Sequence, residues 1–298
     1  MKRINLFHGI LLLFVAGFFS SCSQEERNEM PESKTTVAEL TTRLKAYNTS
    51  IGVTVPADDD TRAFPKVTFT NKDKIKIAIA DVKGALRGGA TGGVPGALVG
   101  AAVQSLIKAA KMYAWKQLTA TLKSSYCNGL VFGTNGVAAF TDSIGYYHNI
   151  LEAEMYRQDS LSHQTSTVLL MRRANNIMRS TSRGYTLYGP MLISWLDNMA
   201  TTAKTINDIN DEEMSFDEYC TRLKVMHPAD AAYLDFAAEY LYAAFYGNVD
   251  LQEYTEQVLF IINNSNAGVE DARLLNYCIQ VAHASVIYNN NTETTSNQ

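Results

Sequence analysis

Residues 84–100 read GALRGGATGGVPGALVG, and this stretch decides the fold class of the chain. Glycines recur in it every four residues, at Gly84, Gly88, Gly92, Gly96 and Gly100. A second row of small residues runs beside the first: Ala85, Gly89, Gly93, Ala97, Ala101, Ser105 and Ala109. Residues four apart share one face of an α-helix, so the two rows predict smooth stripes that let another helix approach closely. Because glycine costs about 1 kcal/mol relative to alanine inside a helix, tight packing is needed to stabilise this segment.

The glycine segment has three interpretations. The first is a helical hairpin that bends at residues 92–95 and packs its small faces together or against the rest of the protein. The second is insertion into a membrane, because residues 88–107 contain no charged side chain and are long enough to span a bilayer. The third is a phosphate-binding loop, although neither GxxxxGK(S/T) nor GxGxxG after a strand is present. We favour the hairpin.

Helical periodicity extends outward from this segment through most of the chain. We expect helices from about residue 71 to the bend, from Pro95 to about residue 126, and then at residues 137–157, 165–180, 184–207, 215–226, 229–246, 250–264 and 269–288. Residues 22–65 are polar and hold half of the six prolines, which is typical of a tether, and one helical patch interrupts them. The sequence therefore predicts an all-α multi-helix bundle with a glycine-rich helical hairpin, as a single domain over residues 66–298.

The composition is that of a globular protein. The chain has 298 residues, of which 46% are hydrophobic and 19% are charged, so it is neither disordered nor fibrous. Its net charge of −4 argues against a nucleic-acid partner, because such proteins carry a basic stripe.

The N-terminus has the features of an export signal. Lys2 and Arg3 precede an apolar stretch over residues 10–19, and two serines then lead to Cys22. This arrangement resembles the lipobox of bacterial lipoproteins of the Gram-negative anaerobe type, with Phe19 where that family usually has leucine. The resemblance implies that residues 1–21 are a signal peptide and that Cys22 carries acyl chains such as palmitate. It also implies attachment to the outer membrane, with the domain facing the periplasm or the cell exterior.

A second resemblance concerns the body of the chain. Asp81-Val82-Lys83-Gly84-Ala85, the Gly/Ala run after it and residues 142–151, DSIGYYHNIL, are similar to a group of uncharacterised bacterial secreted proteins. The shared motif of that group is GxxHNxxL, and the leucine of this chain, Leu151, stands one position early. This resemblance implies location and a helical fold, and it implies no activity.

The best candidate for chemistry in the sequence is His148. Glu152 follows four residues later and shares its helix face, which is a spacing that metal ligands use. Asn149 is adjacent, and Asp142 lies off that face and would need a bent helix start to join. No HExxH motif, second nearby histidine or cysteine ligand supports a site, so hydrogen bonding of the His-Asn pair to neighbouring backbone is the alternative.

These patterns lead to a first hypothesis about function. We expect a non-enzymatic binding or structural module at the cell envelope, with no cofactor, because no assembled catalytic or cofactor motif is present. Its partners would be the membrane, through the lipid anchor, and an unknown protein or glycan. The alternatives are a membrane-active protein that uses its glycine rows and a metal-dependent hydrolase that uses His148 and Glu152.

Overall fold

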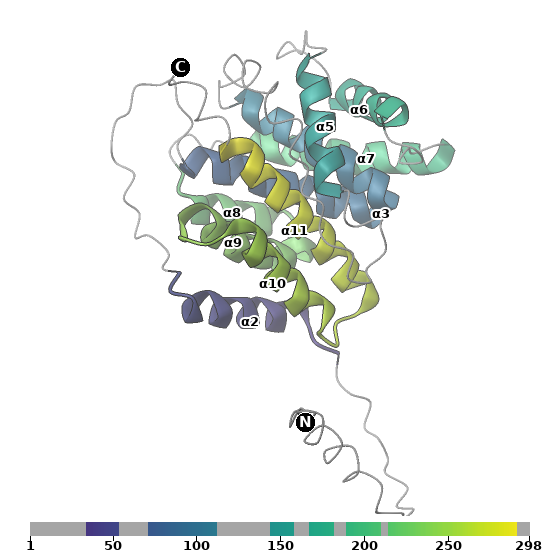
Figure 1. The fold of residues 1–298 in the computed structure, drawn as a ribbon. Helices are drawn as coiled ribbons and strands as arrows, with labels where there is room; N and C mark the ends of the chain where they lie inside the picture. Colours follow the sequence, from purple (N-terminus) through teal and green to yellow (C-terminus); the bar gives the residue numbers. More distant parts are fainter. Residues whose placement is uncertain are drawn as a thin grey trace, which may run out of the picture. The chain divides into compact units, whose positions relative to one another are not determined.

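The computed structural model describes residues 34–53, 71–111, 144–157, 167–181, 189–209 and 214–290. Its α-helices are α2 (Val37–Ser50), α3 (Asn71–Lys111), α5 (Ile144–Arg157), α6 (Thr167–Thr181), α7 (Gly189–Asp208), α8 (Phe216–Met226), α9 (Ala231–Tyr246), α10 (Leu251–Asn263) and α11 (Val269–Asn290). They pack around one apolar core (Figure 1). Within the described ranges the only extended pairing is an isolated bridge between Thr35 and Ala267. The expected all-α multi-helix bundle is confirmed.

Helix α3 contains the hairpin that the glycine rows predict. Its chain direction reverses at Gly93, whose φ of 59° and ψ of −146° are not helical, and Pro95 follows in the first turn of the second half. A Cβ atom on Gly84 would collide with the backbone of Gly100, and a Cβ atom on Gly88 would collide with that of Gly96. The two halves therefore touch backbone to backbone, and the glycine-rich helical hairpin of the predicted fold class is confirmed.

Helix α11 packs against the second row of small residues. A Cβ atom on Gly89 would lie 2.7 Å from the ring of Tyr277, so the absence of a side chain there makes room for an aromatic residue. On the other side of the hairpin, Trp195 and Met199 of α7 lie against Gly96 and Gly100. Helix α3 is thus covered by α11 and α7 and forms the centre of the bundle (Figure 1).

Helix α2 belongs to this packed body, although it lies inside the stretch that the sequence presents as a tether. A capping box of Thr36 and Glu39 begins it, and Val37, Leu40 and Leu44 are buried in the common core. Asn48 also donates a hydrogen bond of 3.2 Å to the backbone carbonyl of Glu239 in α9. The packed body therefore begins before residue 66, because the helical patch within residues 22–65 has an apolar face to bury.

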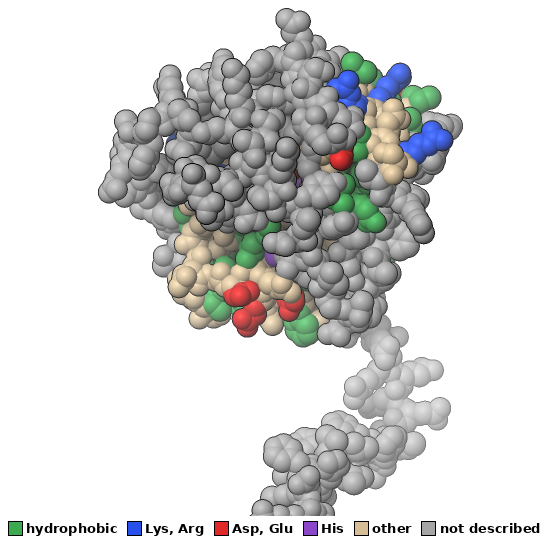
Figure 2. Space-filling model, turned by 45° about the horizontal axis from the view of Figure 1, so that its top comes forward, with side chains coloured by type: hydrophobic (Ala, Val, Ile, Leu, Met, Phe, Trp, Pro, Cys, Tyr) green, Lys and Arg blue, Asp and Glu red, His purple; other side chains and the backbone are tan. Residues whose placement is uncertain are grey.

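The remaining helices agree with the expected ranges to within a few residues where the structure describes them, and residues 112–143, with the end of the second expected helix, lie outside it. Basic side chains gather over α6 (Figure 2), a helix that carries Arg172, Arg173 and Arg179 and no acidic residue. Its opposite face buries Met171, Ala174 and Met178. No helix within the described ranges is both long enough and apolar enough to cross a bilayer.

Candidate metal centre

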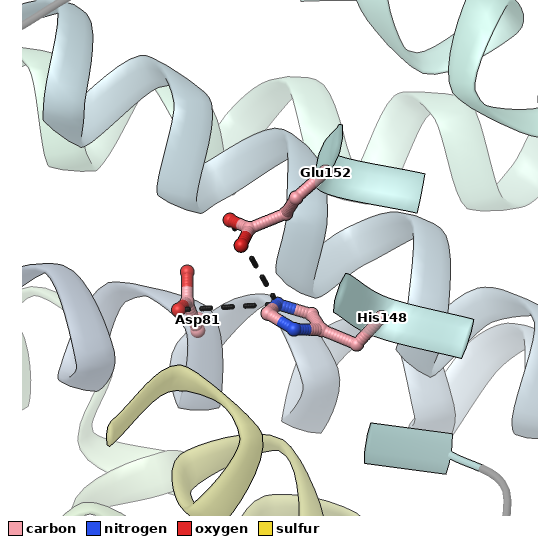
Figure 3. A group of neighbouring side chains, drawn as sticks. All are labelled: Asp81, His148 and Glu152. Carbon is pink, nitrogen blue, oxygen red and sulfur yellow. Dashed lines mark ion pairs between the residues drawn. The ribbon is translucent and has the colours of Figure 1, made fainter. Parts of the chain in front are cut away.

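Three buried side chains with metal-ligating atoms converge at the junction of α3 and α5 (Figure 3). Asp81 comes from the first half of the hairpin, and His148 and Glu152 come from successive turns of α5. The Nε2 atom of His148 lies 3.9 Å from Asp81 Oδ2 and 4.0 Å from Glu152 Oε1. All three side chains are at most 1% exposed.

The small-residue rows of α3 explain why a carboxylate can reach this place. Asp81 stands four residues before Ala85 and so continues the row that passes Gly89 and faces α11. Ser105 belongs to the matching row in the second half of the hairpin. The hydroxyl of Ser105 faces both Asp81 and Glu152, and that of Ser285 on α11 faces Asp81. The second row of small residues, along which the helices approach closely, therefore leads to a buried polar cluster between α3, α5 and α11.

The protonation of His148 is set by its neighbour Asn149. The side-chain Nδ2 of Asn149 donates to the backbone carbonyl of Ala284 at 3.3 Å, which leaves Oδ1 as the atom facing His148 Nδ1 at 3.0 Å. Since this oxygen only accepts hydrogen bonds, Nδ1 carries the proton of the neutral ring. The lone pair on Nε2 consequently points toward the two carboxylates, in the tautomer that a metal ligand needs.

Burial changes the acidity of every member of this cluster. It raises the pKa of Asp81 well above its ordinary value, with help from the negative charge of Glu152 and against partial opposition from Ser285 and Ser105. Burial also raises the pKa of Glu152 to about 8, again opposed by Ser105. It lowers the pKa of His148 to about 4, opposed by the hydrogen bond with Asn149. Each group is thus driven toward its uncharged form in a site without a compensating ion.

The facing atoms of the cluster make no hydrogen bonds. Although the serine hydroxyls face the carboxylates, no donor reaches Asp81 Oδ1, Asp81 Oδ2, Glu152 Oε1 or His148 Nε2 with hydrogen-bond geometry. Buried polar atoms in folded proteins nearly always have a partner, so four unpartnered atoms in one pocket require an explanation.

A divalent transition-metal ion fits these donors. Zinc binds imidazole nitrogen and carboxylate oxygen at about 2.0–2.2 Å, which places tetrahedral ligand atoms about 3.4 Å apart. The observed separations of 3.9 and 4.0 Å exceed that spacing by about half an ångström, a change that small side-chain rotations supply. Two carboxylates would balance the charge of the ion, and the imidazole favours zinc or iron over calcium or magnesium.

The structure brings together part of the predicted site. His148 and Glu152 share one face of α5 and meet, as their spacing predicts, while Asn149 contacts the ring of His148 and the backbone of α11. Asp142 lies outside the described residues. Asp81 was missed, although a signal exists: it is the only charged residue within the apolar run of residues 77–82.

The other buried histidine has different surroundings. His283 Nδ1 lies 2.7 Å from the hydroxyl of Thr255 and 3.4 Å from that of Tyr240. The Thr255 hydroxyl donates to the Leu251 carbonyl at 2.6 Å, so it is not available as a nucleophile. This cluster therefore joins α9, α10 and α11 and has no catalytic arrangement.

His227 terminates α8, where a cation would suit the helix dipole. Burial and the nearby cations Lys83 and Arg87 lower its pKa to about 4, so it is neutral at pH 7 and supplies no such charge. The charges at this place are instead Lys83 and Arg87, which both pair with Asp230. The free thiols of Cys220 and Cys278 are buried, and burial raises the pKa of both, which disfavours a nucleophilic role.

No protein-family model, curated protein or solved structure matches this chain. The resemblances to lipoproteins and to secreted helical proteins therefore remain predictions, and the argument for function depends on the geometry of the site.

Proposed function

We propose that this protein is an envelope lipoprotein whose helical domain binds one divalent transition-metal ion between α3 and α5. The observation that carries the proposal is a buried cluster in which two carboxyl groups and the Nε2 lone pair of an imidazole face one another, and their facing atoms make no hydrogen bond. Such a set of acceptors repels itself when the carboxylates are ionised, and a cation of charge +2 removes that repulsion. The proposal departs from the expectation of no cofactor, because Asp81 joins His148 only in the folded chain.

Binding without catalysis suits this geometry better than hydrolysis does. A catalytic zinc site keeps a position open for water and substrate, whereas the three ligands here are at most 1% exposed. The ion would act as an internal brace between α3 and α5. The serine hydroxyls of Ser105 and Ser285 face the carboxylates and would orient them from the outer sphere.

The test is a measurement of metal content with a matched pair of variants. Purified protein exposed to zinc and then dialysed should retain about one equivalent by elemental analysis. Glu152→Gln should lose the ion, while Glu154→Gln, on the same helix but only half-buried, should retain it. A wild-type protein that retains neither zinc, iron nor manganese would refute the proposal.

The anchor is tested separately from the ion. Residues 1–21 would be removed as a signal peptide, Cys22 would carry the acyl chains, and the domain would face the periplasm or the cell exterior. Several acyl chains give stable attachment where a single chain gives only marginal binding. Metabolic labelling with palmitate should be lost in Cys22→Ala, and label retained by that variant would contradict lipidation.

A further inference from the structure

The candidate metal centre is deeply buried. Asp81, His148 and Glu152 are at most 1% exposed, and among the described residues its walls are both halves of α3, α5 and α11. Exchange of an ion at ligands this deeply buried requires a local opening of the structure.

Two of the walls are fixed by close contacts. The halves of α3 meet backbone to backbone at Gly84 and Gly88, and α11 places the ring of Tyr277 against Gly89. Helix α11 is also joined to α10 through the contact between His283 and Thr255. Moving either helix would break the centre of the bundle.

Helix α5 also packs closely against α11, because a Cβ atom on Gly145 would lie 3.0 Å from the carbonyl oxygen of Gln280 and Asn149 donates to the carbonyl of Ala284. What distinguishes this helix is the share of the site that it carries. It has 14 residues, and its apolar anchors Ile144, Leu151 and Met155 lie on the same helix as His148 and Glu152. Two of the three ligands and the orienting Asn149 therefore travel with α5, and only Asp81 stays behind. Displacing this one helix opens the whole site in a single step.

We propose that α5 is the gate of this metal site, which moves away from α3 and α11 to exchange the ion and is held closed by the bound ion. The inference rests on the proposed metal binding. Without an ion, docking α5 leaves its imidazole and one carboxylate oxygen in the core without partners, which weakens docking of this helix in particular. An ion that binds only the docked arrangement shifts the population toward it.

Hydrogen exchange measures this docking directly. Amides of α5 should exchange at least about tenfold faster in protein stripped with a chelator than in zinc-loaded protein, because local opening controls their exchange. Amides of α10, which contributes no residue to the site, serve as the internal control and should change little. Equal protection of α5 with and without zinc, in protein that binds zinc, would overturn the gate.

Release kinetics give a second and independent measurement. Leu151→Ala removes an apolar anchor of α5 without touching a ligand, and transfer of zinc from this variant to a chelating dye should be roughly tenfold faster or more. Leu223→Ala makes the same deletion in α8, also at a fully buried position, and should release zinc at the wild-type rate. If Leu151→Ala does not fold, Ile144→Val applies the same test with a smaller deletion.

The outcomes separate the two proposals. Protein that never binds zinc overturns both metal binding and the gate. Protein that binds zinc but releases it equally fast from the α5 and α8 variants overturns the gate alone. Faster release confined to the α5 variant supports both.

Discussion

Two buried histidines of this protein have the same residue type and nearly the same burial, yet different neighbours. His148 and His283 are both almost fully enclosed, and burial lowers the pKa of each to about 4. Hydroxyl groups lie within hydrogen-bond distance of His283 Nδ1, whereas carboxylates lie 3.9 and 4.0 Å from His148 Nε2. Burial alone therefore does not identify a histidine as a metal ligand. The chemistry of the groups that face the ring does.

The two histidines should differ most in what their substitution does to zinc binding. His148→Ala should lower zinc affinity by more than about 100-fold, beyond the loss of roughly 10–100-fold that is typical of an outer-sphere change. His283→Ala should keep about one equivalent of zinc and lose stability instead, because it breaks the contact between α10 and α11. Isothermal titration with zinc checks both variants. Equal affinities would remove the distinction between the two sites.

The hairpin that carries Asp81 supplies the next test. Gly96→Leu should lower the free energy of unfolding by more than about 3 kcal/mol, because its side chain meets the backbone of Gly88 and overpacking is costly. Ala90→Leu, at an exposed position of α3, is the matched control and should change stability little. Thermal melts measure the difference. An unchanged melting temperature of Gly96→Leu, together with altered leakage of anionic liposomes, would favour the membrane-active alternative.

The stability of the metal-free protein should depend on pH in a way that distinguishes the cluster around His148 from the cluster around His283 at alkaline pH. The pKa of Glu152 is raised from 4.5 to about 8, so its favourable contribution is complete below pH 4.5 and is lost as the pH rises through about 8. Glu152→Gln should reduce this loss in urea denaturation between pH 6 and pH 9, and Asp81, whose pKa is also raised by burial, should account for the remainder.

On the acid side the two histidines should behave alike. Because the pKa values of both histidines are lowered from 6.5 to about 4, their contribution to stability is present above pH 6.5 and is lost as the pH falls through about 4.

The alkaline prediction for Glu152 has a clear contrary outcome. If the stability of Glu152→Gln falls from pH 6 to pH 9 as steeply as that of the wild type, the alkaline loss does not come from Glu152.

A smaller effect is expected from the group that orients His148. Asn149→Ala should weaken zinc binding by roughly 10–100-fold, because it removes the acceptor that fixes the proton on Nδ1. The asparagine also bonds Ala284, so a stability measurement in excess chelator is the control. Zinc affinity equal to that of the wild type would show that the tautomer does not depend on Asn149.

The smallest effect concerns the cluster around His283. Tyr240→Phe removes a hydroxyl that lies 2.7 Å from Thr255, and the free energy of unfolding should fall by about 1 kcal/mol. Zinc affinity should not change, since Tyr240 contributes nothing to the metal centre. A loss of zinc in this variant would mean that the two clusters are coupled.

The helical architecture could be predicted from local patterns in the sequence. Apolar residues at helical spacing and polar breaks place most helices to within a few residues, because amphipathic periodicity is a local property. The glycine rows predict the hairpin for the same reason, since a stripe without side chains has to be covered. The pairing of His148 with Glu152 was also accessible, because a spacing of four residues on a helix fixes their relative position.

The groups that face one another in the core could not be predicted from the sequence, because they come together only when the helices pack. Asp81 lies 67 positions before His148 in the chain, and it reaches the imidazole because α3 folds back at Gly93 and α5 packs across it. No local pattern encodes that contact, just as none assigns Tyr277 to the space above Gly89 or α2 to the packed body. Local spacing fixes positions along one helix, whereas the packing of several helices fixes the neighbours of a buried side chain, and these neighbours determine its chemistry.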